Sequence, residues 1–102
     1  MNVIARPAID AAIRRHADAR GWLETWWTVA NAARWENLHQ VRADYLAADQ
    51  VGRCLVFNAK GNKYRLIVRV VYAHQWQNGT LFVKYFLTHA EYDEDRWKGA
   101  CD

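Results

Sequence analysis

Side chains that together could cleave RNA occur in two short stretches of the sequence, VFNAKGNKYRLIVRVVY and THAEYDED. The first contains Arg65, the second contains His89 and Tyr92, and Lys84 lies between them. Cleavage of RNA by its own 2′-hydroxyl needs a base for the proton, a cation for the crowded phosphate and an acid for the departing oxygen. His89, Arg65 and either Lys84 or Tyr92 are the candidates, and which group is base and which is acid stays open. DNA lacks the 2′-hydroxyl, so this chemistry would spare it.

The distribution of charge favours the same kind of substrate. Residues 51–90 contain six Lys or Arg, two His and no acid, whereas residues 1–50 are balanced and residues 91–102 hold five acids and two cations. Phosphates attract such a basic block, and the aromatic side chains within it offer flat partners for bases. A solvated basic face without a specific partner is the alternative. The further candidates for RNA contacts are Arg53, Lys60, Asn62, Lys63 and Arg69.

Several classes of protein are not expected. The reaction requires no metal ion or other cofactor, and the sequence offers no clustered carboxylates to hold a metal. Cys54 and Cys101 lie far apart and form no CxxC pair, so we interpret them as two incidental thiols rather than a disulfide or a zinc site. The N-terminus lacks a secretory signal, and no apolar run approaches the roughly 20 residues that span a bilayer. We therefore expect a cytoplasmic protein with no membrane partner.

The elements that must position these side chains form a single α+β domain over residues 1–102. A short strand runs through Arg6-Pro7 into a helix, Gly21 interrupts the pattern, and WLETWWTVANAARW continues as a second helix with a broad apolar stripe. The expected order is β-α-α-β-β-β, an antiparallel sheet with the first strand at an edge, the two N-terminal helices on one face and a short C-terminal helix. The three later strands are expected over 54–58, 63–73 and 80–88, with Asn78-Gly79 as a hairpin signal.

Alternation along the strand that contains Arg65 divides its side chains between two faces. Tyr64 and its alternate neighbours are expected beneath the helices, which leaves Lys63, Arg65 and Arg69 in a row on an open face. Because a buried unpaired charge costs several kcal/mol, the row should meet water or an anion. Charges that protect an edge strand from aggregation would explain Lys63 well and Arg65 poorly.

The stretch from Thr88 predicts the start of a short helix. Thr88 and Glu91 have the spacing of a capping box, which places His89 in the first helical turn. There His89 could accept a proton near the strand end, where Lys84 and the cation row are expected to converge.

Other conspicuous residues receive simpler interpretations. Four Trp fall between positions 22 and 35, and we interpret them as core residues, with a partner-binding surface as the alternative. Residues 36–52 are expected to form a short helix and a loop. His16 and His39 are interpreted as exposed polar residues without a chemical role.

The two chemical stretches also resemble a known family. VFNAKGNKYRL together with LTHAEYD resembles the HigB-type toxins of bacterial type II toxin-antitoxin systems, within the RelE/ParE-like superfamily. The resemblance covers roughly Asn2 to Lys98 and includes ADQVG before the first stretch. Its most specific residues are Asn58, Gly61, Asn62, Tyr64 and Arg65, with Thr88, His89, Glu91 and Tyr92.

The resemblance implies a ribosome-dependent mRNA endonuclease, or mRNA interferase, which a cognate HigA-like antitoxin suppresses. In this resemblance, Arg65 matches a strand arginine of RelE-like toxins. Lys84, His89 and Tyr92 match the cations and the tyrosine or histidine near the end of the last strand of those toxins. It also implies that mRNA is cleaved on the ribosome, where basic side chains hold phosphates of ribosomal RNA. Two other functions fit this scaffold, a ParE-like inhibitor of DNA gyrase and a non-catalytic RNA-binding module.

Overall fold

Five strands form one mixed sheet in the order β1-β5-β4-β3-β2, in a computed structural model that describes residues 1–102. Strand β1 runs parallel to β5, and every other neighbouring pair is antiparallel. The predicted α+β class and the edge position of the first strand are confirmed, and β2 is a short strand where the sequence predicted a loop. The strands are β1 (Asn2–Ile4), β2 (Asp49–Val51), β3 (Cys54–Ala59), β4 (Tyr64–Val71) and β5 (Thr80–Thr88).

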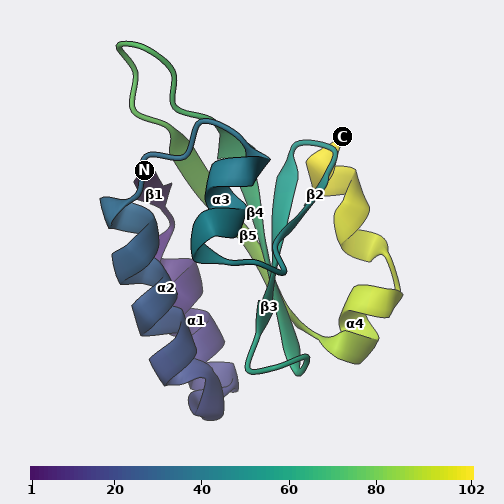
Figure 1. Ribbon diagram of the computed structural model, residues 1–102. Coiled ribbons are helices and arrows are strands. Elements are labelled where there is room, and N and C mark those ends of the chain that lie inside the picture. The colour runs from purple at the N-terminus through teal and green to yellow at the C-terminus, as the bar shows by residue number, and fades with distance from the viewer.

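The helices lie on both faces of this sheet (Figure 1). The first two cover one face together with α3, while α4 and the C-terminal end lie on the other. The helices are α1 (Arg6–Arg15), α2 (Arg20–Ala32), α3 (Leu38–Asp44) and α4 (His89–Asp93), with 3₁₀ turns η1 (Ala17–Ala19) and η2 (Arg96–Cys101). None of them combines the length and the apolar character that crossing a membrane requires.

The larger core lies between the sheet and the N-terminal helices. Trp26 of α2 is fully buried and meets Phe57 of β3 edge to face, with ring centroids 5.6 Å apart. Trp35 is also buried, and Trp22 and Trp27 are partly buried against the same cluster. The Trp residues of this region therefore serve mainly as core, as interpreted from the sequence.

The break between the first two helices differs from the prediction. Gly21 lies inside α2, one residue after its start, and α1 ends at Arg15 with His16 as its C-cap. The 3₁₀ turn η1 then changes the direction of the chain. Gly21 is exposed and does not interrupt the helix, because a single glycine near a helix start costs only about 1 kcal/mol.

The hairpin between β4 and β5 also turns at another place than the sequence predicted. His74 and Gln77 exchange backbone hydrogen bonds of 3.1 and 2.7 Å, so the chain reverses before Asn78-Gly79. Gly79 is instead buried where a Cβ would lie 2.6 Å from the carbonyl oxygen of Val71. A glycine is needed there for close backbone approach, which also allows its carbonyl to accept the N–H of Asn2 at 2.7 Å.

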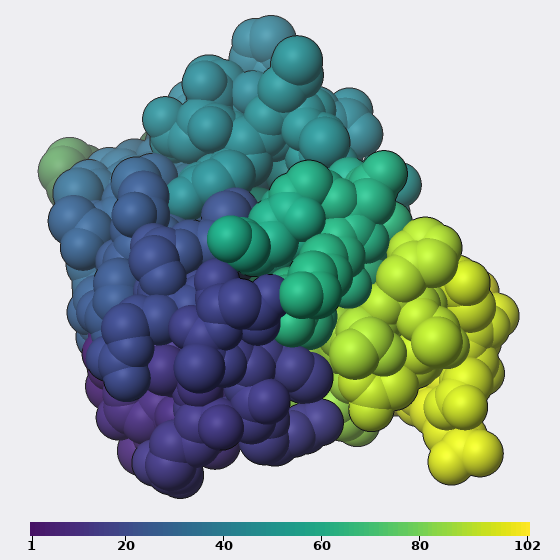
Figure 2. All heavy atoms as spheres, turned by 90° about the horizontal axis from the view of Figure 1, so that it is seen from below, coloured from purple at the N-terminus to yellow at the C-terminus, as the bar shows by residue number.

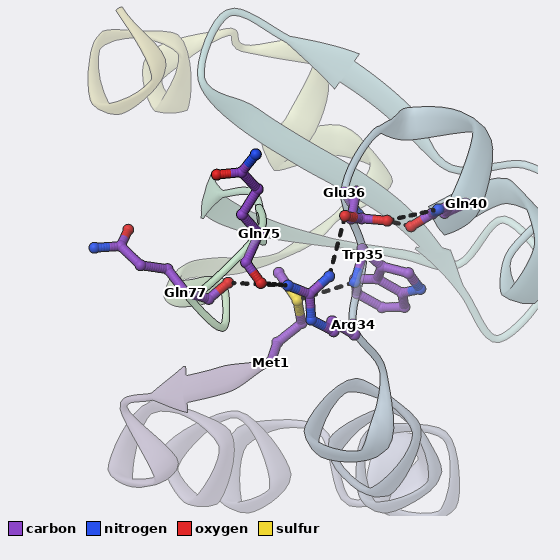
Figure 3. Close-up of polar contacts among 7 residues, drawn as sticks. All are labelled: Met1, Arg34, Trp35, Glu36, Gln40, Gln75 and Gln77. Atoms are coloured by element: carbon purple, nitrogen blue, oxygen red, sulfur yellow. Dashed lines mark hydrogen bonds and ion pairs between the residues drawn. The ribbon is translucent and has the colours of Figure 1, made fainter.

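Arg34 fixes this loop to the body of the protein (Figure 3). Its Nη2 donates to the carbonyl oxygen of Gln75 at 3.0 Å, and its Nη1 forms an ion pair with Glu36 at 3.0 Å. The next residue, Trp35, donates its backbone N–H to the Sδ atom of Met1. The chain start and the β4–β5 loop are thereby held against the end of α2.

The second face of the sheet is covered around the middle of β3 and β4, which corrects the expectation of an open face there. Ile67 is fully buried with Val56, under Trp97 and Cys101 of η2. We call residues 94–102 the C-terminal strap. The strap follows α4 and crosses the outer face of the sheet, so apolar side chains there pair with the strap and are not left in water.

The two cysteines are joined by a disulfide, so their interpretation as incidental thiols was wrong. Cys54 at the start of β3 and Cys101 at the end of the strap have Cα atoms 5.1 Å apart although 47 positions separate them in sequence. Gly52 accommodates this junction: its φ is positive, and a Cβ there would lie 2.1 Å from the carbonyl oxygen of Cys101. That oxygen accepts the N–H of Arg53 at 2.7 Å.

Candidate functional site

Three segments that are distant in sequence meet at one end of the molecule. The β3–β4 hairpin lies there between the end of α1 and helix α4 (Figure 2). The hairpin turn has positive φ angles at Lys60 and Gly61, and His89 donates its backbone N–H to the carbonyl oxygen of Lys63 at 3.2 Å. This end therefore collects most of the predicted site residues.

Arg65 is the central cation of this end, and it is largely buried instead of lying on an open face. It is 8% exposed, and its Nη1 donates to the carbonyl oxygens of Asn62 and Tyr64, each at 3.1 Å. Its guanidinium carbon lies 5.3 Å from the ring centroid of Tyr92. Carbonyl dipoles and an aromatic face thus stabilise a charge that would otherwise be costly to bury.

Part of the Arg65 guanidinium remains available to a ligand. Nε and Nη2 make no hydrogen bond within the protein, and neither belongs to the fully buried side-chain atoms without a partner. These two nitrogens retain contact with solvent and form one side of the planar fork that binds a phosphate with two hydrogen bonds.

Helix α4 carries the groups that could transfer protons. The predicted capping box is confirmed: the Thr88 hydroxyl accepts from the N–H of Glu91, whose carboxylate accepts from the N–H of Thr88. The backbone hydrogen bond from Thr88 holds the pKa of Glu91 below its usual range. His89 is exposed, with Nε2 3.5 Å from an Asp93 oxygen. The box therefore fixes where His89 enters the site.

Tyr92 is held between a cation and an indole. On one side lies Arg65, and on the other the ring of Trp97 stacks at a centroid distance of 4.9 Å with planes 12° apart. The Tyr92 hydroxyl makes no hydrogen bond within the protein, whereas its backbone carbonyl accepts from Nε1 of Trp97 at 2.9 Å. The ring position of Tyr92 thus depends on the strap.

Asn62, a predicted RNA contact, also has a structural role. Its carbonyl accepts from Arg65, and its side-chain oxygen accepts from Nδ2 of Asn58 at 3.2 Å. Asn58 lies directly opposite Arg65 in the β3–β4 ladder. The two asparagines therefore hold the turn that presents Arg65.

Lys63 bends away from the cation row to meet a carboxylate that sequence reasoning missed. Strand β4 starts only at Tyr64, and Nζ of Lys63 lies 2.6 Å from Oδ2 of Asp18 in η1. The Tyr64 hydroxyl donates to the other oxygen of Asp18 at 2.8 Å. The hydrogen bond from Lys63, which has the largest effect, and the one from Tyr64 both lower the pKa of Asp18. No local sequence signal links residues that are 45 positions apart.

This cluster predicts a pH dependence of stability. Because the pKa of Asp18 is lowered in the folded protein, its contribution is present above the unfolded value of about 3.9 and is lost as pH falls through the folded value. Asp18→Asn should lower the free energy of unfolding at pH 7 and lower it by less at pH 2. Urea unfolding across this range measures the effect. Asp102→Asn is the control, and an Asp18→Asn effect that is equal at both pH values would contradict the assignment.

Lys84 does not converge on Arg65, which corrects the sequence-based expectation. A β-bulge between β4 and β5 leaves Lys84 without a partner in β4, and Arg65 pairs with Leu87 instead. Lys84 lies with Arg69 in an open hollow of about 300 Å³, and its Nζ is 5.8 Å from the Phe82 ring centroid. The side chains of Lys84 and Arg69 thus belong to a different part of the sheet surface.

The remaining candidates are dispersed. Lys60 is exposed at the hairpin tip, and Arg53 is exposed beside the disulfide at the other end of β3. His39 is exposed as interpreted, but His16 is not: its ring packs on Tyr64 at 4.8 Å, and its Nε2 is buried without a hydrogen-bond partner. No group of three or more His, Cys, Asp or Glu is arranged to hold a metal ion.

Comparison with known proteins places the chain within a recognised family. A family model described as HigB_toxin, RelE-like toxic component of a toxin-antitoxin system, matches residues 19–95. The match runs from the end of η1 through α4, so it includes Arg65, His89 and Tyr92 and stops before Trp97 and Cys101. No curated protein matches the chain.

Proposed function

The chain belongs to the HigB family of RelE-like toxins of toxin-antitoxin systems, and from this membership we propose that it is a ribosome-dependent mRNA endonuclease. The observation that carries the proposal is the contact of Arg65 with Tyr92 beside the first turn of α4, where His89 is exposed. A guanidinium, an imidazole and a phenol at one end of the sheet support the proposal, because they can supply the cation, the base and the acid that metal-independent RNA cleavage requires.

The proposed reaction is attack of a ribose 2′-oxygen on the adjacent phosphorus. His89 takes the 2′-hydroxyl proton, and the Asp93 carboxylate beside it stabilises the resulting imidazolium. Nε and Nη2 of Arg65 bind the phosphate oxygens as negative charge builds on them. The Tyr92 hydroxyl gives its proton to the departing 5′-oxygen, so the products carry a 2′,3′-cyclic phosphate and a 5′-hydroxyl.

The other cations are proposed to hold the substrate complex instead of taking part in the reaction. Lys84 and Arg69 line the hollow on the sheet, and Lys60 and Arg53 lie at opposite ends of β3, too widely spread to act on one phosphate. Such a distribution suits the phosphates of mRNA and ribosomal RNA around a decoding site. Replacing these cations should weaken RNA binding and reduce the salt dependence of binding more than it slows bond cleavage.

The family also implies an antitoxin partner. We propose that a HigA-like antitoxin binds the chain and that the toxin acts in the cytoplasm, where messages are translated. The antitoxin could occupy the catalytic end itself or another surface.

Mapping the 5′ ends of cellular mRNA after brief induction tests the proposed function. New ends should fall within translated frames, and His89→Ala should remove them. The fold should persist in His89→Ala, because the His89 side chain is exposed and its one contact, with an Asp93 oxygen at 3.5 Å, is long. DNA breaks without RNA cuts would favour gyrase inhibition, and protection of RNA without new ends would favour a non-catalytic binder. Either result would contradict the proposal.

A further inference from the structure

The C-terminal strap packs against the residue that lies over Arg65. Arg65 is covered by Tyr92, Tyr92 is stacked on Trp97, and Trp97 belongs to the same 3₁₀ turn as Cys101. A continuous series of contacts therefore leads from the disulfide to the phosphate-binding cation. An arginine that must bind a phosphate is expected to be well exposed, yet Arg65 is 8% exposed, and only Nε and Nη2 of its guanidinium retain contact with solvent without a hydrogen bond in the protein.

The end of the strap is fastened at a prepared position. Gly52 leaves room for the Cys101 carbonyl, which accepts from Arg53, and the disulfide fixes the same residue to β3. Without the disulfide, the strap retains the Arg53 hydrogen bond, the Trp97 ring and the hydrogen bond from Trp97 to Tyr92. Segments held by few contacts open readily, so loss of the covalent bond should let the strap lift more often.

We propose that Cys54 and Cys101 form a reversible thiol–disulfide site that limits access to Arg65 and to the outer ring face of Tyr92. The disulfide form is the covered form, and the dithiol form releases the strap and admits RNA. The functional part of this inference rests on the proposed nuclease activity.

The chemical step is a two-electron exchange with a dithiol reductant. A thiolate of the reductant attacks one sulfur of the pair, so that a mixed disulfide forms and the Cys54–Cys101 bond breaks. The second reductant thiolate then attacks the reductant sulfur of the mixed disulfide and expels the protein thiolate, and the two protein thiolates take the two protons that the reductant has lost. Two protein thiols form and the reductant becomes a disulfide. Cys54 is 0% and Cys101 2% exposed, so the reductant reaches them only when the strap end lifts. Reducing compartments favour the dithiol form.

Hydrogen exchange on the oxidised and reduced full-length protein tests the release directly. Dithiothreitol is the reductant. Thiol alkylation followed by intact-mass measurement first establishes whether the two cysteines are oxidised or reduced. Reduction should lower amide protection over residues 96–101 by about 30-fold or more, because the disulfide no longer closes the loop between Cys54 and Cys101. Protection in α2, which lies in the larger core, should fall by a smaller factor. Equal protection over 96–101 in both states, or failure of the two thiols to oxidise, would overturn the proposal.

Two variants separate the effect of losing the disulfide from any other effect of the reductant. Cys101→Ser should show the reduced pattern without dithiothreitol, and Cys54→Ser should match it if it folds. Gly99→Ala is the matched control, because a Cβ there meets nothing within 4 Å and the disulfide is retained. A Cys101→Ser protein that keeps wild-type protection over 96–101 would contradict the proposal.

Cleavage assays then distinguish the regulation from the nuclease activity itself. The reduced protein and Cys101→Ser should cleave ribosome-bound mRNA at least about tenfold faster than the oxidised protein, in proportion to the open population. Equal cleavage by both forms overturns the regulatory claim. Absence of cleavage in every form, with the exchange difference present, overturns the proposed function and leaves the disulfide-controlled strap established.

Discussion

Arg65→Ala is expected to lower the rate of mRNA cleavage by about 10²- to 10³-fold, which corresponds to roughly 3–4 kcal/mol of lost transition-state stabilisation. The effect should be this large because Arg65 is the cation at the site with two guanidinium nitrogens free for phosphate oxygens. The burial of Arg65 under Tyr92 strengthens its field by excluding water. Single-turnover cleavage of mRNA on purified ribosomes measures the rate.

Two further variants define what Arg65 contributes. Arg65→Lys keeps the charge but cannot bind two backbone carbonyls and a phosphate in one plane, so an intermediate loss is expected. Arg69→Ala removes a cation of the same strand at a distance from Tyr92, and should cost less than about tenfold. If Arg65→Ala cleaved as fast as Arg69→Ala while remaining folded, the assignment of Arg65 to the reaction would be wrong.

Trp26→Ala is expected to lower the free energy of unfolding by about 3–5 kcal/mol, the largest stability loss in the chain. Trp26 is 0% exposed, and its ring fills the space between α2 and Phe57. Alanine would leave a cavity that the surrounding helices and strands can close only in part. Urea unfolding of the oxidised protein at pH 7 measures the change.

The same residue type provides the control at an exposed position. Trp76 is 93% exposed in the β4–β5 loop, so Trp76→Ala should change stability by no more than about 0.5 kcal/mol. Trp26→Phe should cost much less than Trp26→Ala, because it keeps a ring in the core and removes an indole N–H that has no hydrogen-bond partner. A Trp26→Ala protein as stable as Trp76→Ala would show that the packing of α2 is wrong.

Local signals in the sequence were sufficient for the elements that carry the site. The Thr88 and Glu91 spacing predicted the start of α4, because a capping box involves only four consecutive residues. The alternation of β4 correctly assigned Tyr64 to the helix-facing core. The resemblance drawn from the two chemical stretches was confirmed by the family match over residues 19–95.

Features that depend on distant contacts could not be predicted in this way. The disulfide joins residues 47 positions apart, and nothing near Cys54 indicates that the strap returns to it. The ion pair of Lys63 with Asp18 could not be predicted for the same reason, because 45 positions separate the two residues. The bulge that separates Lys84 from Arg65 depends on how β5 pairs with β4, because one extra residue changes which side chains converge.

The state of the C-terminal strap connects stability with function in this account. The strap buries Ile67 under Trp97 and so completes the smaller core, and Trp97 also stacks on Tyr92, which lies over the cation proposed to bind the scissile phosphate. Both roles follow from the position of the strap across β3 and β4. A toxin of this construction would be most active where its two cysteines are reduced.

The most direct test of metal-independent cleavage by a 2′-hydroxyl uses one message prepared in two forms. Reduced protein is added to ribosomes that hold the message, with either ribose or 2′-deoxyribose at the nucleotide before the mapped cut. The ribose form should be cleaved to a 2′,3′-cyclic phosphate and a 5′-hydroxyl, and the deoxy form should stay intact. Cleavage of the deoxy form at a similar rate would contradict the account.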